Sequence, residues 1–553
     1  MTDIGTKSVA GTKFQKNNWW KQAVIYQIYP RSFCDSNGDG IGDLPGILSR
    51  LDYLETLGID AIWLSPVFCS PQDDNGYDIS DYQNIDPLFG TLGDMDRLIA
   101  EAGKRGIRII LDMVLNHSSD EHRWFREAKK SRDNPYHDYY IWRDGDGVTP
   151  PNGLKAGFGG SAWEWVPELG QYYFHQFSVK QPDLNWDNPA LRAELYRMIN
   201  WWADRGIGGF RLDVVDHLGK DPDHGLMKCA PTLHPYVREM SREAFRRPGL
   251  VTVGEAWSAD VEGAKLYSNP DGSELSMVFQ FEHMKIDQIP GKEKWDMVPL
   301  DFVGLKKIFS HWQKGLYGQG WNSLFWENHD LPRSVSRFAD DGAFRVESAK
   351  MLAILLHGMQ GTPYVYQGEE LGMTNYDFRV EECRDIEILN MVRERRKKGY
   401  SEEWIRDVIR RKGRDNARTP MQWNTAPNAG FTTGEPWLVV NPNYRDINAE
   451  DQITRNDSVF ACYKTLIRLR KELPVLVNGT YEPLLEEDGH IFAYRRDDGE
   501  NRLLVVCNFF GDPVPNPLRE EEKGGRLLLS SYDSVGEDPS FLRPYEARML
   551  LFE

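Results

Sequence analysis

Eight short apolar segments rich in β-forming residues recur along the chain, and each ends in polar or charged residues. They span residues 24–33, 59–68, 107–117, 207–215, 250–257, 276–283, 321–330 and 362–370. Stretches with helical periodicity separate several of them, as in residues 94–106. Apolar strands that alternate with helices are typical of a parallel sheet buried on both faces. Eight such strands predict an α/β fold, a (β/α)₈ TIM barrel, whose catalytic residues lie at the carboxyl ends of the strands.

Two regions interrupt this alternation and predict additional domains. Residues 118–186 form a long excursion after the third strand, and they are rich in aromatic residues. From residue 478 onward the chain contains short alternating segments joined by glycine-containing turns, which is typical of an all-β module. We therefore expect a barrel made of residues 1–117 and 187–477, an inserted subdomain at 118–186, and a C-terminal β-sandwich at 478–553. An open doubly wound sheet is the structural alternative, but no glycine-rich dinucleotide fingerprint supports it.

Charge and composition exclude several classes of partner. The 553 residues carry a formal net charge of −18, which argues against binding nucleic acid or anionic lipid through bulk charge. The basic run at 393–414 is interleaved with acidic residues, so we interpret it as a solvated helical surface. The six cysteines form no CxxC pair, and no run of 18 apolar residues predicts a membrane span. The first twenty residues lack an apolar signal core, so we expect a cytoplasmic location. For the oligomeric state we expect a monomer or a weak homo-oligomer.

Three carboxylates follow predicted strands and are candidates for catalysis. Asp213 ends the fourth strand, Glu255 the fifth and Asp330 the seventh, so a closed barrel would bring them to one mouth. Two carboxyl groups that flank a glycosidic bond can serve as nucleophile and acid/base, and a separation of about 5 Å gives retention of configuration. A single strand-end carboxylate is more often a capping group, whereas three at one mouth favour a catalytic site.

Six motifs make the chemistry more specific. They are "DMVLNH" (112–117), "QPDLN" (181–185), "GFRLDVV" (209–215), "VGEAW" (253–257), "ENHD" (327–330) and "GRDNARTPMQW" (413–423). In this order the chain resembles glycoside hydrolase family 13, the α-amylase family, and within it the oligo-1,6-glucosidase branch. The resemblance covers nearly the whole chain. It implies an α-glucosidase that acts on small oligosaccharides.

The resemblance also implies a role for each of the three acids. Asp213 would be the nucleophile, Glu255 the general acid and then base, and Asp330 would hold sugar hydroxyls and stabilise the transition state. Arg211 precedes Asp213 by two residues and shares its strand face, so it can favour the ionised form of that carboxylate. Glu255 needs a dry setting or a nearby negative charge in order to stay protonated.

Further residues are implied to bind the substrate. The set is Asp74, Tyr77, His117, Phe158, Phe177, Gln181, Arg211, His329 and Arg414. Phe158 and Phe177 would wall the acceptor side, and the ring of Tyr77 suits stacking on a sugar. Arg418 lies one helical turn from Arg414 and is the alternative to it.

The segment "DSNGDGIGD" (35–43) resembles the metal loop of the same branch. The side chains of four residues and one backbone carbonyl would supply five oxygen ligands, and these residues are Asp35, Asn37, Asp39, Ile41 and Asp43. The bidentate Glu of an EF-hand is missing, because position 12 is Gly46. We expect a structural Ca²⁺ ion, with Mg²⁺ or a metal-free turn as alternatives, and no organic cofactor.

The preferred linkage rests on Val214, which follows the nucleophile. Enzymes of this branch that act on α-1,6 bonds tend to carry Val there, whereas α-1,4-preferring maltases tend to carry Thr or Ala. Trehalose-6-phosphate hydrolases also carry Val, so they remain an alternative, as do sucrose-active enzymes. The chain lacks the "RLDRD"-type segment of sucrose isomerases, which favours hydrolysis. A non-catalytic, transporter-associated relative would have lost catalytic acids that this chain keeps.

Overall fold

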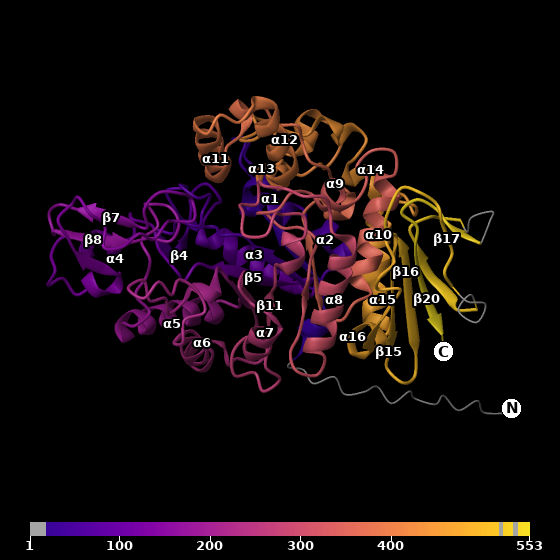
Figure 1. The fold of residues 1–553 in the computed structure, drawn as a ribbon, viewed down its shortest axis with the longest axis horizontal. Coiled ribbons are helices and arrows are strands. Elements are labelled where there is room, and N and C mark those ends of the chain that lie inside the picture. The colour runs from indigo at the N-terminus through magenta and orange to yellow at the C-terminus, as the bar shows by residue number, and fades with distance from the viewer. Residues whose placement is uncertain (1–17, 519–523, 535–539, 553) are drawn as a thin grey trace.

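The eight predicted strands form one parallel sheet that closes into a barrel (Figure 1). They are β1 (Ile25–Ile28), β2 (Ala61–Leu64), β5 (Arg108–Met113), β9 (Gly209–Leu212), β10 (Val251–Glu255), β11 (Met277–Phe279), β12 (Ser323–Leu324) and β13 (Thr362–Tyr366). Their order is β11-β10-β9-β5-β2-β1-β13-β12, and every neighbouring pair is parallel. A parallel bridge between Val278 and Asn322 joins β11 to β12, so the sheet closes and the open doubly wound alternative is wrong.

The structure is a computed structural model that describes residues 18–518, 524–534 and 540–552. The prediction that no signal peptide is present falls almost wholly on residues 1–17, outside the described part. All six cysteines are free thiols. Within the described residues, no helix is long and apolar enough to cross a membrane.

Helices cover the outside of the barrel and bury apolar side chains. They include α2 (Leu51–Leu57), α3 (Leu92–Lys104), α5 (Pro189–Asp204), α7 (Val261–Tyr267), α8 (Phe302–Leu316), α10 (Arg345–His357) and α15 (Val459–Glu472). In α3 a capping box between Thr91 and Asp94 fixes the first turn, and Met95, Leu98 and Ala102 are buried. Helix α10 is buried on all sides over residues 348–357, and α15 packs against it.

The excursion after β5 is a small antiparallel subdomain, seen at the left of Figure 1. Its strands are β6 (Trp142–Asp144), β7 (Trp163–Val166) and β8 (Gln171–Phe174), in the order β6-β8-β7, and α4 (Arg123–Ala128) lies beside them. A bridge between His117 and Asp183 ties its two ends together where it leaves and rejoins the barrel. Residues from opposite ends of the excursion are thereby brought to the barrel mouth.

A second excursion follows β13, and sequence reasoning missed it as a unit. It contains α11 (Ile386–Lys397), α12 (Glu402–Lys412) and α13 (Asp415–Arg418), which lie above the barrel in Figure 1. We call residues 374–418 the roof. Ile388, Val392, Ile405, Val408 and Ile409 form part of its own apolar core. We interpreted the charged run at 393–414 as a solvated helical surface. That interpretation holds only for the outer side of the roof, where Arg396 pairs with Glu402.

The C-terminal region is the expected all-β domain. A five-stranded antiparallel sheet has the order β14-β15-β16-β20-β18. Its strands are β14 (Thr480–Leu484), β15 (Ile491–Asp497), β16 (Arg502–Asn508), β18 (Arg526–Ser530) and β20 (Ala547–Phe552). The ribbon of β17 (Val514–Pro515) and β19 (Phe541–Leu542) shares an apolar cluster with that sheet. The two sheets therefore bury a common core, as in a sandwich.

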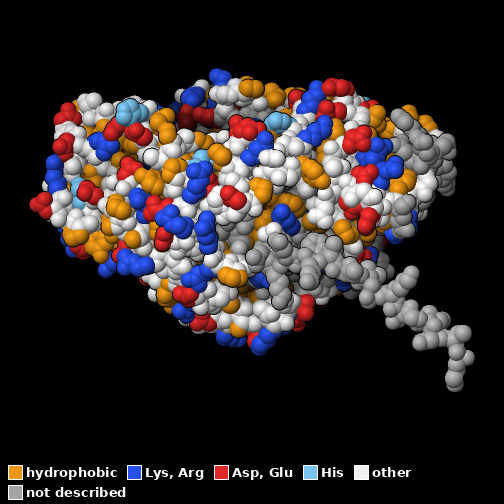
Figure 2. Space-filling model, turned by 90° about the horizontal axis from the view of Figure 1, so that it is seen from below, with side chains coloured by type: hydrophobic (Ala, Val, Ile, Leu, Met, Phe, Trp, Pro, Cys, Tyr) orange, Lys and Arg blue, Asp and Glu red, His pale blue; other side chains and the backbone are white. Residues whose placement is uncertain are grey.

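The surface carries no single-sign patch on the face drawn in Figure 2. Acidic and basic side chains intermingle there, and apolar side chains are scattered. This pattern agrees with the exclusion of nucleic acid that the net charge of −18 suggested.

Candidate active site

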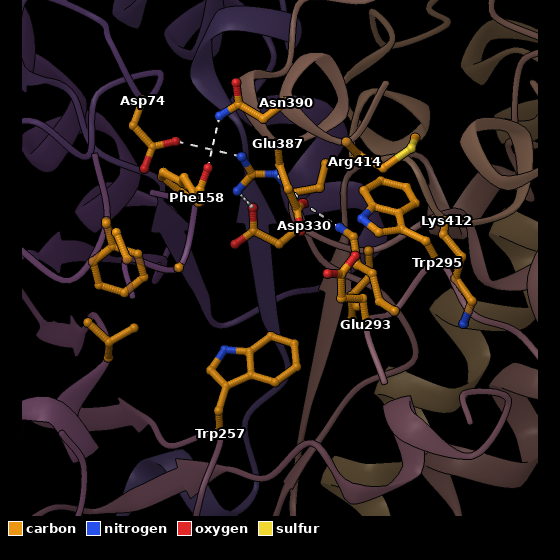
Figure 3. Close-up of a pocket in the computed structure, with 18 of the residues that line it drawn as sticks. Asp74, Phe158, Trp257, Glu293, Trp295, Asp330, Glu387, Asn390, Lys412 and Arg414 are labelled. Carbon is orange, nitrogen blue, oxygen red and sulfur yellow. Dashed lines mark hydrogen bonds and ion pairs between the residues drawn. The ribbon is translucent and has the colours of Figure 1, made fainter. Parts of the chain in front are cut away.

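A cavity of about 620 Å³ contains the carboxyl groups that follow the barrel strands (Figure 3). The barrel contributes Asp213, Glu255 and Asp330, the inserted subdomain contributes Phe158 and Phe177, and the roof contributes further residues. The three predicted catalytic acids therefore face one space.

One buried arginine organises two of these acids. The Arg211 guanidinium is 1 % exposed and donates a hydrogen bond of 2.7 Å to Asp213 and one of 2.5 Å to Glu255. It also donates to Asp112 at 2.8 Å, from the neighbouring strand β5. Because these strands are adjacent and in register, Asp112 lies directly beside Arg211. The predicted contact between Arg211 and Asp213 is confirmed, and Asp112 is a partner that sequence reasoning did not name.

Three carboxyl groups around a single cation favour retention of a proton. Arg211 lowers the pKa of Asp213, as expected, but burial outweighs it and raises the pKa well above its usual range, so Arg211 alone does not keep this carboxyl group ionised. Burial likewise raises the pKa of Asp112. Glu255 is 3 % exposed and receives further hydrogen bonds from the Trp257 indole at 2.9 Å and the Val214 backbone N–H at 3.2 Å. The dry setting expected for a general acid is therefore present.

Asp330 has the opposite electrostatic environment. Burial raises its pKa, but His329, Arg414 and Arg418 together lower the pKa well below its usual range. Arg414 donates to Asp330 at 3.1 Å and Arg418 at 2.9 Å. Only Arg414 is among the residues that line the cavity, which favours it over Arg418 as the sugar contact. Asp330 is thus held ionised and ready to accept hydrogen bonds from sugar hydroxyls.

The structure separates the nine predicted substrate residues into two groups. Six line the cavity, namely Asp74, Tyr77, His117, Phe158, Phe177 and Arg414. The other three, Gln181, Arg211 and His329, are buried behind it. Gln181 donates to Asp74 at 3.2 Å, and the His329 Nε2 lies 2.6 Å from the Tyr77 hydroxyl. These three residues therefore hold side chains that line the cavity and do not line it themselves.

Asp74 and Arg414 form a buried ion pair in the cavity wall. Their nearest charged atoms are 3.7 Å apart, and Arg414 also pairs with buried Asp385 at 2.5 Å. Burial raises the pKa of Asp74 to about 7, against the opposing charge of Arg414. Carboxyl groups and a fixed guanidinium in a buried wall suit the hydroxyl groups of a sugar.

Val214 has a backbone conformation that is rare for its residue type. Its φ is 34° and its ψ is 50°, in the left-handed region that β-branched residues avoid. The chain turns sharply after Asp213, and Val214 consequently lines the cavity instead of pointing away from it as in a regular strand. Strain of this kind persists where the surrounding structure enforces it, and it often marks functional sites.

The cavity is also lined by residues that sequence reasoning missed. They include Trp257, Lys285, Lys294, Trp295, Glu387 and Asn390. Lys294 forms an ion pair with Glu387 of the roof, which also lies 3.3 Å from Arg414. Apart from Trp257, which ends the motif "VGEAW", these residues belong to none of the six motifs, and the tertiary fold brings them together. Trp257 alone could have been found, because it follows Glu255 by two residues.

The predicted metal loop folds back on its own backbone. Asp35 accepts hydrogen bonds from the N–H groups of Asn37 and Gly38, Asn37 from that of Asp39, and Asp39 from that of Ile41. Asp43 caps α1 (Leu44–Ser49) by accepting from the Gly46 N–H. No three His, Cys, Asp or Glu side chains gather into a metal group anywhere in the described ranges. The loop still offers an oxygen-only donor set, which suits a hard cation such as Ca²⁺.

Comparisons with known proteins agree with this geometry. The family described as "Alpha amylase, catalytic domain" matches residues 27–479. The chain belongs to the α-amylase family of glycoside hydrolases. It is 57% identical to a glucan 1,6-alpha-glucosidase of Streptococcus pneumoniae, over 89% of this chain and 92% of that one. It is 52% identical to an oligo-1,6-glucosidase of Halalkalibacterium halodurans, over 96% and 99%.

A solved structure of another member superimposes closely. The trehalose-6-phosphate hydrolase of Bacillus licheniformis gives a TM-score of 0.91 at 46% identity, and the match covers 96% of this chain and 99% of that one. Family membership, the barrel and glycosidase activity, all predicted from the sequence, are therefore confirmed.

We predict that Asp213→Asn and Glu255→Gln each abolish nearly all turnover by this glycoside hydrolase. Both substitutions keep the size of the side chain but remove the charge or the proton that the chemistry needs. The loss of kcat should be at least about 10²–10⁴-fold, as is usual for an acid/base group. Steady-state kinetics on a disaccharide would measure it, and circular dichroism would check the fold. A variant that kept a tenth of wild-type kcat would remove that residue from the mechanism.

Proposed function

We propose that this family member is a retaining, exo-acting α-glucosidase that releases glucose from the non-reducing ends of short α-1,6-linked glucose chains. One observation carries the proposal. Arg211 holds Asp213 and Glu255 side by side in a cavity whose wall includes Asp74 and Arg414.

The contact with Arg211 supports retention of configuration. Asp213 and Glu255 accept hydrogen bonds from neighbouring nitrogens of one planar guanidinium, so their oxygens are close together. This spacing suits the about 5 Å of retaining enzymes better than the about 6.5–9.5 Å that leaves room for an inverting water. Asp213 would attack the anomeric carbon while Glu255 donates a proton to the departing oxygen. Glu255 would then take a proton from water, which attacks the same carbon and releases Asp213.

The buried wall around Asp74 supports exo action. Asp74, Arg414 and Asp330 are bonded to one another or to Asp385, so this wall has a fixed shape and bears charges suited to sugar hydroxyls. A terminal glucose can rest against it, whereas a longer chain cannot continue through it. The bond that is cleaved is therefore the first one from the non-reducing end.

The surroundings of Val214 support the α-1,6 linkage. An α-1,6 acceptor is joined through a flexible CH₂ group and tolerates an apolar wall, which Val214 provides at the cavity surface. Two relatives at 52% and 57% identity carry names that specify α-1,6 bonds. Trp257 also lines the cavity.

Trehalose-6-phosphate hydrolysis is the second candidate, because the similar solved structure carries that name. A phosphorylated acceptor would need an unneutralised cation in the cavity wall. Lys294 is paired with Glu387, and Lys412 shares Asp287 with Arg337. Burial also lowers the pKa of Lys412 to about 7. These pairings favour a neutral sugar, and Lys155 and Lys285, which also line the cavity, are the cations that a phosphate would have to reach.

The two candidates are distinguished by a substrate panel. We expect the largest kcat/KM for isomaltose and isomaltotriose, lower values for maltose and sucrose, and the lowest for trehalose-6-phosphate. Glucose release by the purified protein measures all five substrates in one assay. A larger kcat/KM for trehalose-6-phosphate than for isomaltose would overturn the proposal in favour of the second candidate.

We predict that Val214→Thr raises the ratio of kcat/KM for maltose over isomaltose. Thr has nearly the shape of Val but adds a hydroxyl that can hold an acceptor ring attached directly at the α-1,4 bond. One net hydrogen bond of about 1 kcal/mol corresponds to about a fivefold change in the ratio. Val214→Ile, which adds no hydroxyl, is the matched control and should leave the ratio closer to that of the wild type. An unmoved ratio in Val214→Thr would show that Val214 does not set the linkage.

We infer that the loop at residues 35–43 binds a structural Ca²⁺ ion, with Mg²⁺ as the alternative. The carboxylates of Asp35, Asp39 and Asp43, the Asn37 amide and the Ile41 carbonyl would hold it. The Asp35 carboxylate also accepts from the Thr432 hydroxyl, so the loop anchors the segment after the roof. We further propose a cytoplasmic location and a monomeric or weakly associating state.

Removal of the ion should lower thermal stability without abolishing the chemistry at once. A ligand that binds only the folded state stabilises it by mass action, about 2.7 kcal/mol at a hundredfold excess over Kd. Differential scanning calorimetry with and without a chelator measures the effect, and Asp39→Asn should reduce it. An unchanged Tm after complete metal removal would show that the loop is a metal-free turn.

A further inference from the structure

A short hairpin of the inserted subdomain reaches over the sugar site. Its arms are joined by hydrogen bonds from the Ala162 N–H to the Leu154 carbonyl and from the Ala156 N–H to the Gly160 carbonyl. The tip has the sequence Gly-Phe-Gly-Gly at 157–160, and the φ angles of the last two glycines are +96° and +86°. A side chain at either of these glycines would meet no atom within 4 Å. Within its own subdomain the tip is held by the Gly157 N–H, which donates to the Gln176 carbonyl at 2.6 Å, whereas Gly159 and Gly160 stand open.

Phe158, at this tip, lies over Arg414, one of the residues that would hold the glucose, whereas the sequence placed it on the acceptor side. Its ring lies 5.6 Å from the Arg414 guanidinium and 5.7 Å from the ring of Phe177. The Phe177 ring in turn lies 5.2 Å from that of His117. Because Arg414 is bonded to Asp330, a displacement of Phe158 would uncover the polar end of the cavity.

An amide of the roof bonds to the tip from the other side of the cavity. The Asn390 Nδ2, on α11, donates a hydrogen bond of 3.0 Å to the Phe158 carbonyl, which is drawn as a dashed line in Figure 3. The Asn390 Oδ1 accepts from Arg393 at 3.1 Å, so the orientation of the amide is fixed. This bond joins the inserted subdomain to the roof across the cavity. The two excursions from the barrel are thus fastened together above the sugar site.

We propose that Asn390 is a positioning residue that holds the Phe158 tip over the terminal glucose and thereby contributes to substrate affinity. The proposal rests on the α-glucosidase function proposed above, and it adds a residue outside the six motifs. The tip touches the sugar end and not the reacting carboxylates, so its contribution should be similar in the ground state and in the transition state. Loss of such uniform binding raises KM and leaves kcat nearly unchanged.

The test compares Asn390→Asp with Arg393→Met. Asn390→Asp keeps the shape but places a carboxylate oxygen against the Phe158 carbonyl, whereas Arg393→Met leaves the Asn390 donor intact. For Asn390→Asp we expect KM for isomaltose to rise about fivefold, the effect of one lost hydrogen bond, with kcat within twofold of the wild type. Arg393→Met keeps the donor and loses only the bond that orients the amide, so it should raise KM by less than Asn390→Asp does. Asn390→Ala, which removes the donor without adding charge, should raise KM by a similar factor.

Hydrogen exchange supplies a readout that a merely structural role would not move. Peptides covering residues 154–162 should exchange several-fold faster in Asn390→Asp than in the wild type and Arg393→Met, with the rest of the chain unchanged. Faster exchange at a wild-type KM would overturn the positioning role. A raised KM without faster exchange would also overturn it, because Asn390 would then act on the sugar directly. Hydrogen exchange is measured without substrate, so it tests the role of Asn390 independently of the α-1,6 proposal. If the α-1,6 proposal fails, the wild-type protein will not cleave isomaltose, and this result is distinct from any change in exchange.

Discussion

The interaction on which the site depends is the buried Arg211 guanidinium and its three carboxyl partners. Asp112, Asp213 and Glu255 come from three adjacent strands, β5, β9 and β10, and only a closed parallel sheet in this register brings them around one side chain. Removing the positive charge would leave buried carboxylates uncompensated, a change that typically costs about 3–5 kcal/mol. The same arginine fixes the spacing of nucleophile and acid. Stability of the barrel mouth and geometry of catalysis therefore depend on one residue.

Two long excursions convert the barrel mouth into a walled cavity. The inserted subdomain brings Phe158 and Phe177, and the roof brings Arg414, Glu387 and Asn390. Each excursion has an apolar cluster of its own, so the walls hold their shape without support from a bound sugar. Charged groups of the roof pair with groups of the barrel, as between Arg414 and Asp74. The barrel supplies the chemistry, and the excursions supply the selectivity for a chain end.

Much of this could be predicted from the sequence, because the signals are local. Alternating strand and helix patterns located all eight strands, and polar residues at the strand ends located Asp213, Glu255 and Asp330. The contact between Arg211 and Asp213 follows from their spacing of two residues on a strand.

Other features depend on contacts between distant segments and left no local signal. The charged run at 393–414 has the pattern of any exposed helix, although neighbouring Asn390 and Glu387 line the cavity. Gln181 and His329 belong to motifs, but only the fold shows that they support Asp74 and Tyr77 from behind. The left-handed turn at Val214 could be anticipated only as a twist at a strand end.

The measurement that tests the central claim most directly is proton NMR of isomaltotriose during the first minutes of hydrolysis. Double displacement by Asp213 and Glu255 at a chain end predicts that newly released glucose appears first as the α-anomer, together with isomaltose, before mutarotation. Glucose that appeared first as the β-anomer would contradict a mechanism in which Asp213 forms a covalent intermediate.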